Sequence, residues 1–238
     1  MPIYRVHIDS RSRDPHTLVS QPSFSLSKTI SGVREVRVKH VQLANSIYNI
    51  RQGYNDTIQV SNDAGVTFVN HTYIMAGFYD VDTLLSALNV YLQNIMDSDD
   101  EMVRFDTTTN RIEWLLQADM VIGGPNSVLG IEDDGVVSGD MTTLFLSGPM
   151  DVSFVCPQLQ STYNVFTSDH VMGRCQPFLT MPITNGFGTM EYFHPSTQLA
   201  VRLGGQTLSS LDFRIVDTTS GLVLHEVGHW SMVLEVCT

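Results

Sequence analysis

The chain is a succession of short apolar segments separated by turn residues, and only one segment has the period of a helix. IYRVHI (3–8) and REVRVK (34–39) alternate apolar and polar residues. Such alternation is typical of half-buried strands, and the Gly, Pro, Asn and Asp between the segments mark turns. The pattern therefore predicts an all-β fold. Further candidate strands are TLFLSG (143–148), DVSFVC (151–156), FLTMPI (178–183), TMEYF (189–193), QLAVRL (198–203), DFRIV (212–216) and HWSMVLEV (229–236).

The helical segment lies at 80–96, where apolar residues follow i, i+3, i+4 spacing and Asp80 or Asp82 suits the N-cap. Two candidate strands precede it and two follow it. We therefore expect a small α+β subdomain at 52–130, inserted into a β domain made of 1–51 and 131–238. The apolar helical positions are Val81, Leu84, Leu85, Leu88, Tyr91, Leu92 and Ile95; the flanking strand candidates are TIQV (57–60), TFVNHTYI (67–74), MVRFD (102–106) and RIEWLL (111–116).

The length of 238 residues is enough to bury a sizeable core without disulfides or a metal. Three cysteines, Cys156, Cys175 and Cys237, form no paired framework, which indicates free thiols in a reducing compartment. No run of about 18 apolar residues is present, so we expect no membrane span. The first residues, MPIYRVHIDS, also lack the pattern of a signal peptide.

The net charge of −12 is unevenly distributed along the sequence. Residues 1–51 hold eight Lys and Arg against three acids, a net +5, and the remainder carries −17. A basic segment of this kind faces an acidic surface or nucleic acid, or pairs with acidic neighbours of its own kind. Ordinary solvated strand faces are the alternative. Because aromatic residues do not interleave with the basic ones, the pattern argues against a nucleic-acid contact.

HEVGH at 225–229 matches the H-E-x-x-H signature of zinc peptidases. In those enzymes both histidines project from one face of a helix to bind zinc, and the glutamate activates water. The candidate zinc site is therefore His225, Glu226 and His229. A third ligand has to come from upstream, and the sequence gives no reason to prefer one candidate. Examples are His170, His194 and Asp169.

The flanks of this motif favour a strand. The longer H-E-x-x-H-x-x-G-x-x-H signature needs Gly and His where this chain has Met232 and Glu235. After Gly228 the apolar residues alternate, and histidines four apart in a strand are about 13 Å apart, too far for one zinc. We expect a hairpin or bulge at Gly228 and then a final strand, with no catalytic residue, metal ligand or cofactor. Its inward residues are Trp230, Met232, Leu234 and Val236.

Other possible sites are weaker. DSDDE (97–101) lacks the turn glycine and terminal glutamate of a calcium loop, so it is expected to be a solvated loop. GGPNSVLG (123–130) lacks the Lys and Ser or Thr of a phosphate-binding loop and is expected to be a turn. Cys156 and Cys175 are expected to be buried as small apolar residues.

Four segments resemble a known family. The opening IDSRSRDPHTLVSQPSFSLSKTISGVREVRVKHVQLANSIYNI (8–50) is similar to the opening of the penton, or minor capsid, proteins of virophages, polinton-type elements and large eukaryotic DNA viruses. AGFYDVDTLLSALN (76–89) resembles the segment that leads into their inserted helix. SVLGIEDD (127–134) and TSGLVLHEVGHWSMVLEV (219–236) also resemble that family. In this alignment HEVGH falls on the last hairpin.

The resemblance implies a single jelly roll of two four-stranded antiparallel sheets, in a structural capsid protein without enzymatic activity. Five copies would close each fivefold vertex of an icosahedral capsid assembled inside the host cell. The implied partners are four further copies, the major capsid protein, and a vertex spike or internal capsid components. The basic N-terminal segment, with Arg11, Arg13 and Arg37, would then assist association. A zinc peptidase and a non-viral jelly-roll binding module remain the alternatives, because fold alone does not settle function.

Overall fold

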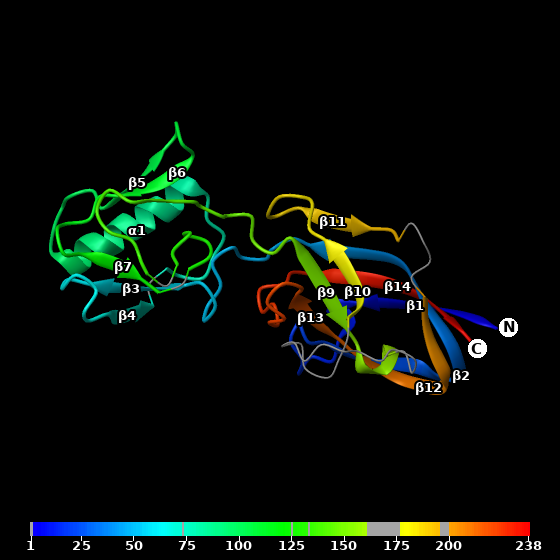
Figure 1. The fold of residues 1–238 in the computed structure, drawn as a ribbon. Helices are drawn as coiled ribbons and strands as arrows, with labels where there is room; N and C mark the ends of the chain where they lie inside the picture. Colours follow the sequence, from blue (N-terminus) through cyan, green and yellow to red (C-terminus); the bar gives the residue numbers. More distant parts are fainter. Residues whose placement is uncertain (1, 73, 125, 133, 161–176, 196–199) are drawn as a thin grey trace. The chain divides into compact units, whose positions relative to one another are not determined.

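The structure is a computed structural model, and the residues described are 2–72, 74–124, 126–132, 134–160, 177–195 and 200–238. These residues are mostly β, in antiparallel sheets with one α-helix, which confirms the predicted fold class at that level (Figure 1). The chain divides into two compact units. Residues 1–47 and 149–238 form the β unit, and residues 48–148 form the inserted unit.

The larger sheet of the β unit brings the two ends of the chain together. Its first and last strands pair in a continuous antiparallel register, from Ile3 opposite Cys237 to Asp9 opposite Ser231. The strand order is β1-β14-β2-β11, and β12 also pairs with β2. The strands are β1 (Ile3–Asp9), β2 (Ser23–Ala44), β11 (Met190–Phe193), β12 (Ala200–Asp212) and β14 (Trp230–Cys237).

Strand β2 is 22 residues long and joins two sets of pairings. Its first part pairs with β12, from Ser23 opposite Asp212 to Arg37 opposite Ala200. Its last part lies between β14 and β11. Gly32 lies within the first part, where the register with β12 shifts, and has a φ of +70°, a backbone conformation that glycine adopts without strain. A glycine that looks like a turn in the sequence therefore lies inside one long strand.

A smaller sheet completes the β unit, with the order β10-β9-β13. The chain just before β2 runs beside it, because Ser20 and Pro22 accept backbone hydrogen bonds from Ile215 and Phe213. Its strands are β9 (Asp151–Val155), β10 (Pro177–Pro182) and β13 (Arg214–Asp217), and two short 3-10 helices are η1 (Ser10–Ser12) and η2 (Pro157–Leu159).

The core of the β unit is centred on Trp230. Its ring makes edge-to-face contacts with Phe24, Phe154 and Phe213, with centroids 5.4 to 6.0 Å apart. Such pairs contribute about 0.5–1.5 kcal/mol beyond the burial of their area. The predicted inward face of the last strand is confirmed, since the following residues are all buried: Trp230, Met232, Leu234 and Val236.

The inserted unit has a core of its own around helix α1 (Val81–Met96). Asp80 caps the helix, accepting from the Thr83 N–H while the Thr83 hydroxyl accepts from the Asp80 N–H. Leu84, Leu88 and Leu92 are fully buried and share one core with two small sheets, in the orders β4-β3-β7 and β5-β6-β8. The strands are β3 (Thr57–Ser61), β4 (Val69–Thr72), β5 (Val103–Asp106), β6 (Arg111–Trp114), β7 (Val121–Gly123) and β8 (Met141–Thr142).

The compact inserted unit is larger than the predicted 52–130. Its second boundary lies at 148 because Ile131 and Val136 are buried in its core, and Leu144 and Leu146 pack against that core. The prediction of a strand at 143–148 is wrong, since these residues have no regular secondary structure. Their alternating apolar residues cover the inserted unit without pairing to a sheet.

Candidate functional site

The HEVGH segment is a turn that leads into β14. His225 and Glu226 lie in the turn, and β14 begins at Trp230. The Ser46 hydroxyl donates to the Glu226 carbonyl at 2.8 Å, and the Ala44 N–H donates to the His229 carbonyl at 2.7 Å. The predicted final strand is confirmed. The predicted hairpin or bulge at Gly228 is wrong, because the turn lies at His225 and Glu226 and the strands on either side, β13 and β14, belong to different sheets. The helix that the zinc-peptidase signature requires is not formed by these residues.

His229 instead belongs to a hydrogen-bonded network with the end of β1. Its Nδ1 atom lies 2.7 Å from the hydroxyl of Ser10, and that hydroxyl accepts the Trp230 N–H at 3.0 Å. Asp9 Oδ1 is 3.7 Å from the same Nδ1 atom. The pKa of Asp9 is lowered to about 2, first by the hydrogen bond from the Arg11 side chain and to a smaller extent by the nearby His229. The network is therefore anionic at Asp9 over the ordinary pH range.

These residues include a serine, a histidine and an aspartate, but their geometry differs from that of a catalytic triad. In a triad one ring nitrogen of the histidine faces the serine and the other faces the aspartate. Here Ser10 and Asp9 both face Nδ1. Ser10 is also only 1% exposed, which leaves little access for a substrate. The arrangement joins the two ends of the chain and does not present an activated nucleophile.

The upstream residues considered as a third zinc ligand are not brought to HEVGH by the described structure. His170 and Asp169 lie outside the described residues. His194 instead contacts His40 of β2, with tilted rings whose centroids are 4.4 Å apart. Across the residues that the structure describes, no group of three His, Cys, Asp or Glu side chains is disposed to hold a metal ion.

The His40–His194 contact was missed by sequence reasoning. The two residues come from separate segments, and Tyr192 of β11 stacks on the same His40 ring at 6.4 Å. Burial lowers the pKa of His40, and the neighbouring His194 lowers it further. A single sequence holds no signal for this contact, because it depends on the pairing of β11 with the end of β2.

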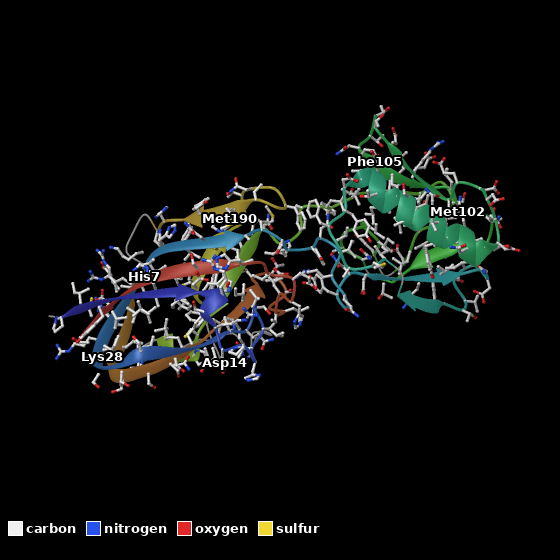
Figure 2. All side chains as sticks on the ribbon, turned by 180° about the vertical axis from the view of Figure 1, so that it is seen from behind. His7, Asp14, Lys28, Met102, Phe105 and Met190 are labelled. Carbon is white, nitrogen blue, oxygen red and sulfur yellow. The ribbon has the colours of Figure 1, made fainter. Side chains whose placement is uncertain are left out.

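Most of the basic residues of the N-terminal segment form ion pairs or hydrogen bonds within the chain. Arg11 pairs with Asp9 at 2.7 Å, and Arg37 pairs with Glu35. A third pairing joins three strands, since Glu235 of β14 lies 3.7 Å from Arg5 of β1 and 3.4 Å from Lys39 of β2. Lys28, labelled in Figure 2, and Arg34 are exposed and form no ion pair with any described residue. They are the basic groups of this segment that are open to an external partner.

The net charge divides between the two compact units in another way than between residues 1–51 and the rest of the sequence. The inserted unit holds three Lys and Arg against fifteen Asp and Glu, a net charge of −12. The β unit holds ten of each and is neutral. The whole net charge of the chain is therefore carried by the inserted unit, which disfavours contact between this unit and phosphate groups.

The remaining sequence candidates have structural explanations. Asp97 ends α1 in a left-handed conformation, and the loop that follows is largely exposed. Gly130 lies in a turn where a Cβ atom would clash with the Thr143 carbonyl oxygen. Burial raises the pKa of Cys156 to about 12, so its thiol is unreactive at neutral pH. Cys175 lies outside the described residues.

None of the helices in the described ranges is long and apolar enough to cross a membrane. No protein-family model matches the chain, and no curated protein matches it by sequence. Among solved structures, the penton protein of mavirus is similar over 98% of this chain and 98% of its own length, with 11% sequence identity and a TM-score of 0.48.

Proposed function

We propose that the chain is a structural protein of an icosahedral viral capsid, a penton subunit of which five copies close each fivefold vertex. The observation that carries this proposal is the position of the segments that resemble the penton family. The opening segment, 8–50, contains β2, and the closing segment, 219–236, contains most of β14. These strands are neighbours in one sheet, with the first strand on the other side of β14.

The proposed jelly roll has two four-stranded sheets. In the larger sheet β1, β14 and β2 occupy three positions, and β11 and β12 both pair with β2 in the fourth. In the smaller sheet the segment at 20–22 runs beside β13 as a fourth partner of β10, β9 and β13. By strand pairing alone the sheets are five-stranded and three-stranded, because β11 and β12 are separate strands beside β2 and 20–22 is not a regular strand.

The proposed partners follow from a ring of five. Cyclic closure requires a head-to-tail interface, in which different surfaces of neighbouring copies meet. The other proposed partners are the major capsid protein and a vertex spike or internal capsid components, and the proposed location is the capsid vertex. The neutral β unit assembles without a large charge penalty, whereas copies of the acidic inserted unit repel one another at short range.

The contribution of the basic segment to association is tested best at basic residues that form no ion pair with the described residues of the chain. Arg11, Arg13 and Arg37 bind groups of their own unit, so their reversal would also disturb the fold. The variant Lys28→Glu/Arg34→Glu is expected to lower incorporation into capsids. The control Arg202→Glu/Arg214→Glu changes the charge of the β unit equally at exposed positions of β12 and β13. Equal incorporation of both variants would contradict a role for the segment.

The assembly is tested by the mass of the purified protein, alone and with the major capsid protein of the same genome. Five copies of 26.5 kDa give a closed ring of about 130 kDa. A zinc peptidase would instead contain stoichiometric zinc that His225→Ala abolishes. A monomeric protein that binds carbohydrate and joins no capsid would favour the binding-module alternative.

A further inference from the structure

The edge strand β11 is attached to β2 next to a cluster of three rings, those of His40, Tyr192 and His194. Four residues of β11 pair with the end of β2, from Met190 opposite Ala44 to Phe193 opposite Val41. Figure 2 labels Met190 on this strand. The His40 ring contacts the phenol of Tyr192 and the imidazole of His194, with centroids 6.4 and 4.4 Å away. A four-residue edge strand has few ladder hydrogen bonds, and the ring contacts add to the bonds that Glu191 of β11 accepts from Thr184 and Asn185.

The surroundings of His40 favour the neutral form of its imidazole. His40 is half-buried, and its Nδ1 atom has no hydrogen-bond partner among the described residues. Burial of a ring without a partner disfavours its charged form, and a second imidazole at 4.4 Å disfavours it again when both are protonated. Histidine is the side chain whose ordinary pKa lets this change occur near neutral pH.

The charged groups near these rings do not offset a positive charge on His40. On β2 the neighbours are the cations Lys39 and Arg37, and on β14 Val233 lies directly opposite His40. Glu235 of β14 is already bound by Lys39 and Arg5. Beyond Val233, His7 of β1 is the next residue in the register, and it is not an acid. No carboxylate of the described residues forms an ion pair with His40 or His194.

We propose that the contacts of His40 with Tyr192 and His194 form a pH-sensitive clasp, which helps to hold β11 on β2 while the His40 imidazole is neutral and loosens when it is protonated. The pKa of His40 in the folded chain is below its ordinary value of 6.5, first because of burial and then because of His194. The unfolded segment therefore binds the proton more tightly than the folded one. The stabilisation of the β11–β2 contact by the clasp is complete above pH 6.5 and is lost as the pH falls through and below that value. The inference does not depend on the proposed capsid function.

The test is amide hydrogen exchange of the full chain at about pH 7.5 and about pH 5.5, corrected for intrinsic exchange rates, since the ordinary histidine pKa lies between these values. We expect the amides of β11 and of its partner residues in β2 to lose protection at the lower pH. The variant His40→Gln/His194→Gln should abolish this pH dependence. The control His16→Gln/His225→Gln removes two exposed histidines elsewhere and should behave as the wild type.

A second readout does not require substitution of the half-buried ring. The exposed His194→Gln variant should raise the pKa of His40, measured by NMR of its ring protons, because it removes the neighbouring imidazole. The proposal is overturned if β11 keeps its protection in the wild type at the lower pH, or if the pair variant and the control lose it equally. A His40 pKa at or above its ordinary value, unchanged by His194→Gln, also overturns it.

Discussion

The hydroxyl of Ser10 and the Nδ1 atom of His229 are 2.7 Å apart, although 219 positions separate them in the chain. Ser10 directly follows β1, and His229 directly precedes β14. The contact therefore fixes one end of the pair formed by the first and last strands. The second histidine of HEVGH therefore helps to hold β1 and β14 together, and this role requires no metal.

Substitution of Ser10 by Ala should destabilise the β unit by about 1–3 kcal/mol, because the buried N–H of Trp230 loses its acceptor. Equilibrium urea denaturation, followed by Trp230 fluorescence in a protein with Trp114→Phe, measures the change. The exposed Ser12→Ala, in the same short 3-10 helix, is the matched control and should have little effect. Equal stability of both variants would show that the Ser10 hydroxyl does not stabilise the unit.

Removal of the Arg11 side chain should alter the acid range of stability. The folded pKa of Asp9 is about 2, below its ordinary value of 3.8, mainly because Arg11 donates to the carboxylate. The stabilisation is complete above pH 3.8 and is lost as the pH falls toward about 2. Arg11→Gln should raise the pKa of Asp9, as measured by NMR of its side-chain carboxyl. Arg13→Gln, which removes bonds to backbone carbonyls only, should leave that pKa unchanged.

Gly228 should not tolerate a side chain. A Cβ atom at this position would lie 2.7 Å from the Ser46 hydroxyl and 3.1 Å from the Ala44 side chain. Gly228→Ala should therefore cost about 1–3 kcal/mol of β-unit stability through overpacking, measured by urea denaturation. At Gly186 a Cβ atom would meet nothing within 4 Å, so Gly186→Ala is the control. A neutral Gly228→Ala would show that the turn does not pack closely on the end of β2.

The two units should respond separately to substitutions in their cores. Each core contains one tryptophan, Trp114 in the inserted unit and Trp230 in the β unit. Leu88→Ala, in the buried face of α1, should destabilise the inserted unit by about 2–5 kcal/mol. The expected shift appears in unfolding followed by Trp114 fluorescence, in a protein with Trp230→Phe, and not in unfolding followed by Trp230.

The matched substitution is Leu234→Ala in β14, which should shift only the Trp230 signal, in a protein with Trp114→Phe. A shift of both signals by either substitution would mean that the two units unfold as one cooperative unit. That result would contradict the division of the chain at residues 47/48 and 148/149.

Local patterns predicted the elements whose signal is contained in a few residues. The i, i+3, i+4 spacing and the acidic cap predicted α1, and the structure begins that helix at Val81 behind Asp80. The alternation after Gly228 predicted the buried face of β14, including Trp230. In both cases the period of the apolar residues matches the element that buries them.

The features that depend on tertiary pairing were not predictable in this way. Residues 143–148 alternate like a strand, but Leu144 and Leu146 pack on the inserted unit without a strand partner. Gly32 looks like a break, but its left-handed conformation is accommodated within β2. The contact between His40 and His194 arises only when β11 pairs with β2. Each of these features depends on contacts with a segment that lies far away in the sequence, so the neighbouring residues alone do not predict it.

The most direct measurement of the proposed function is cryo-electron microscopy of capsids formed by this chain together with the major capsid protein of the same genome. We predict density for five copies around each fivefold axis, with the β unit fitting each copy, and vertices that lack this density when the chain is omitted. Intact capsids whose vertices are the same with and without the chain, or density for the chain at positions other than the fivefold axes, would contradict the assignment as a penton.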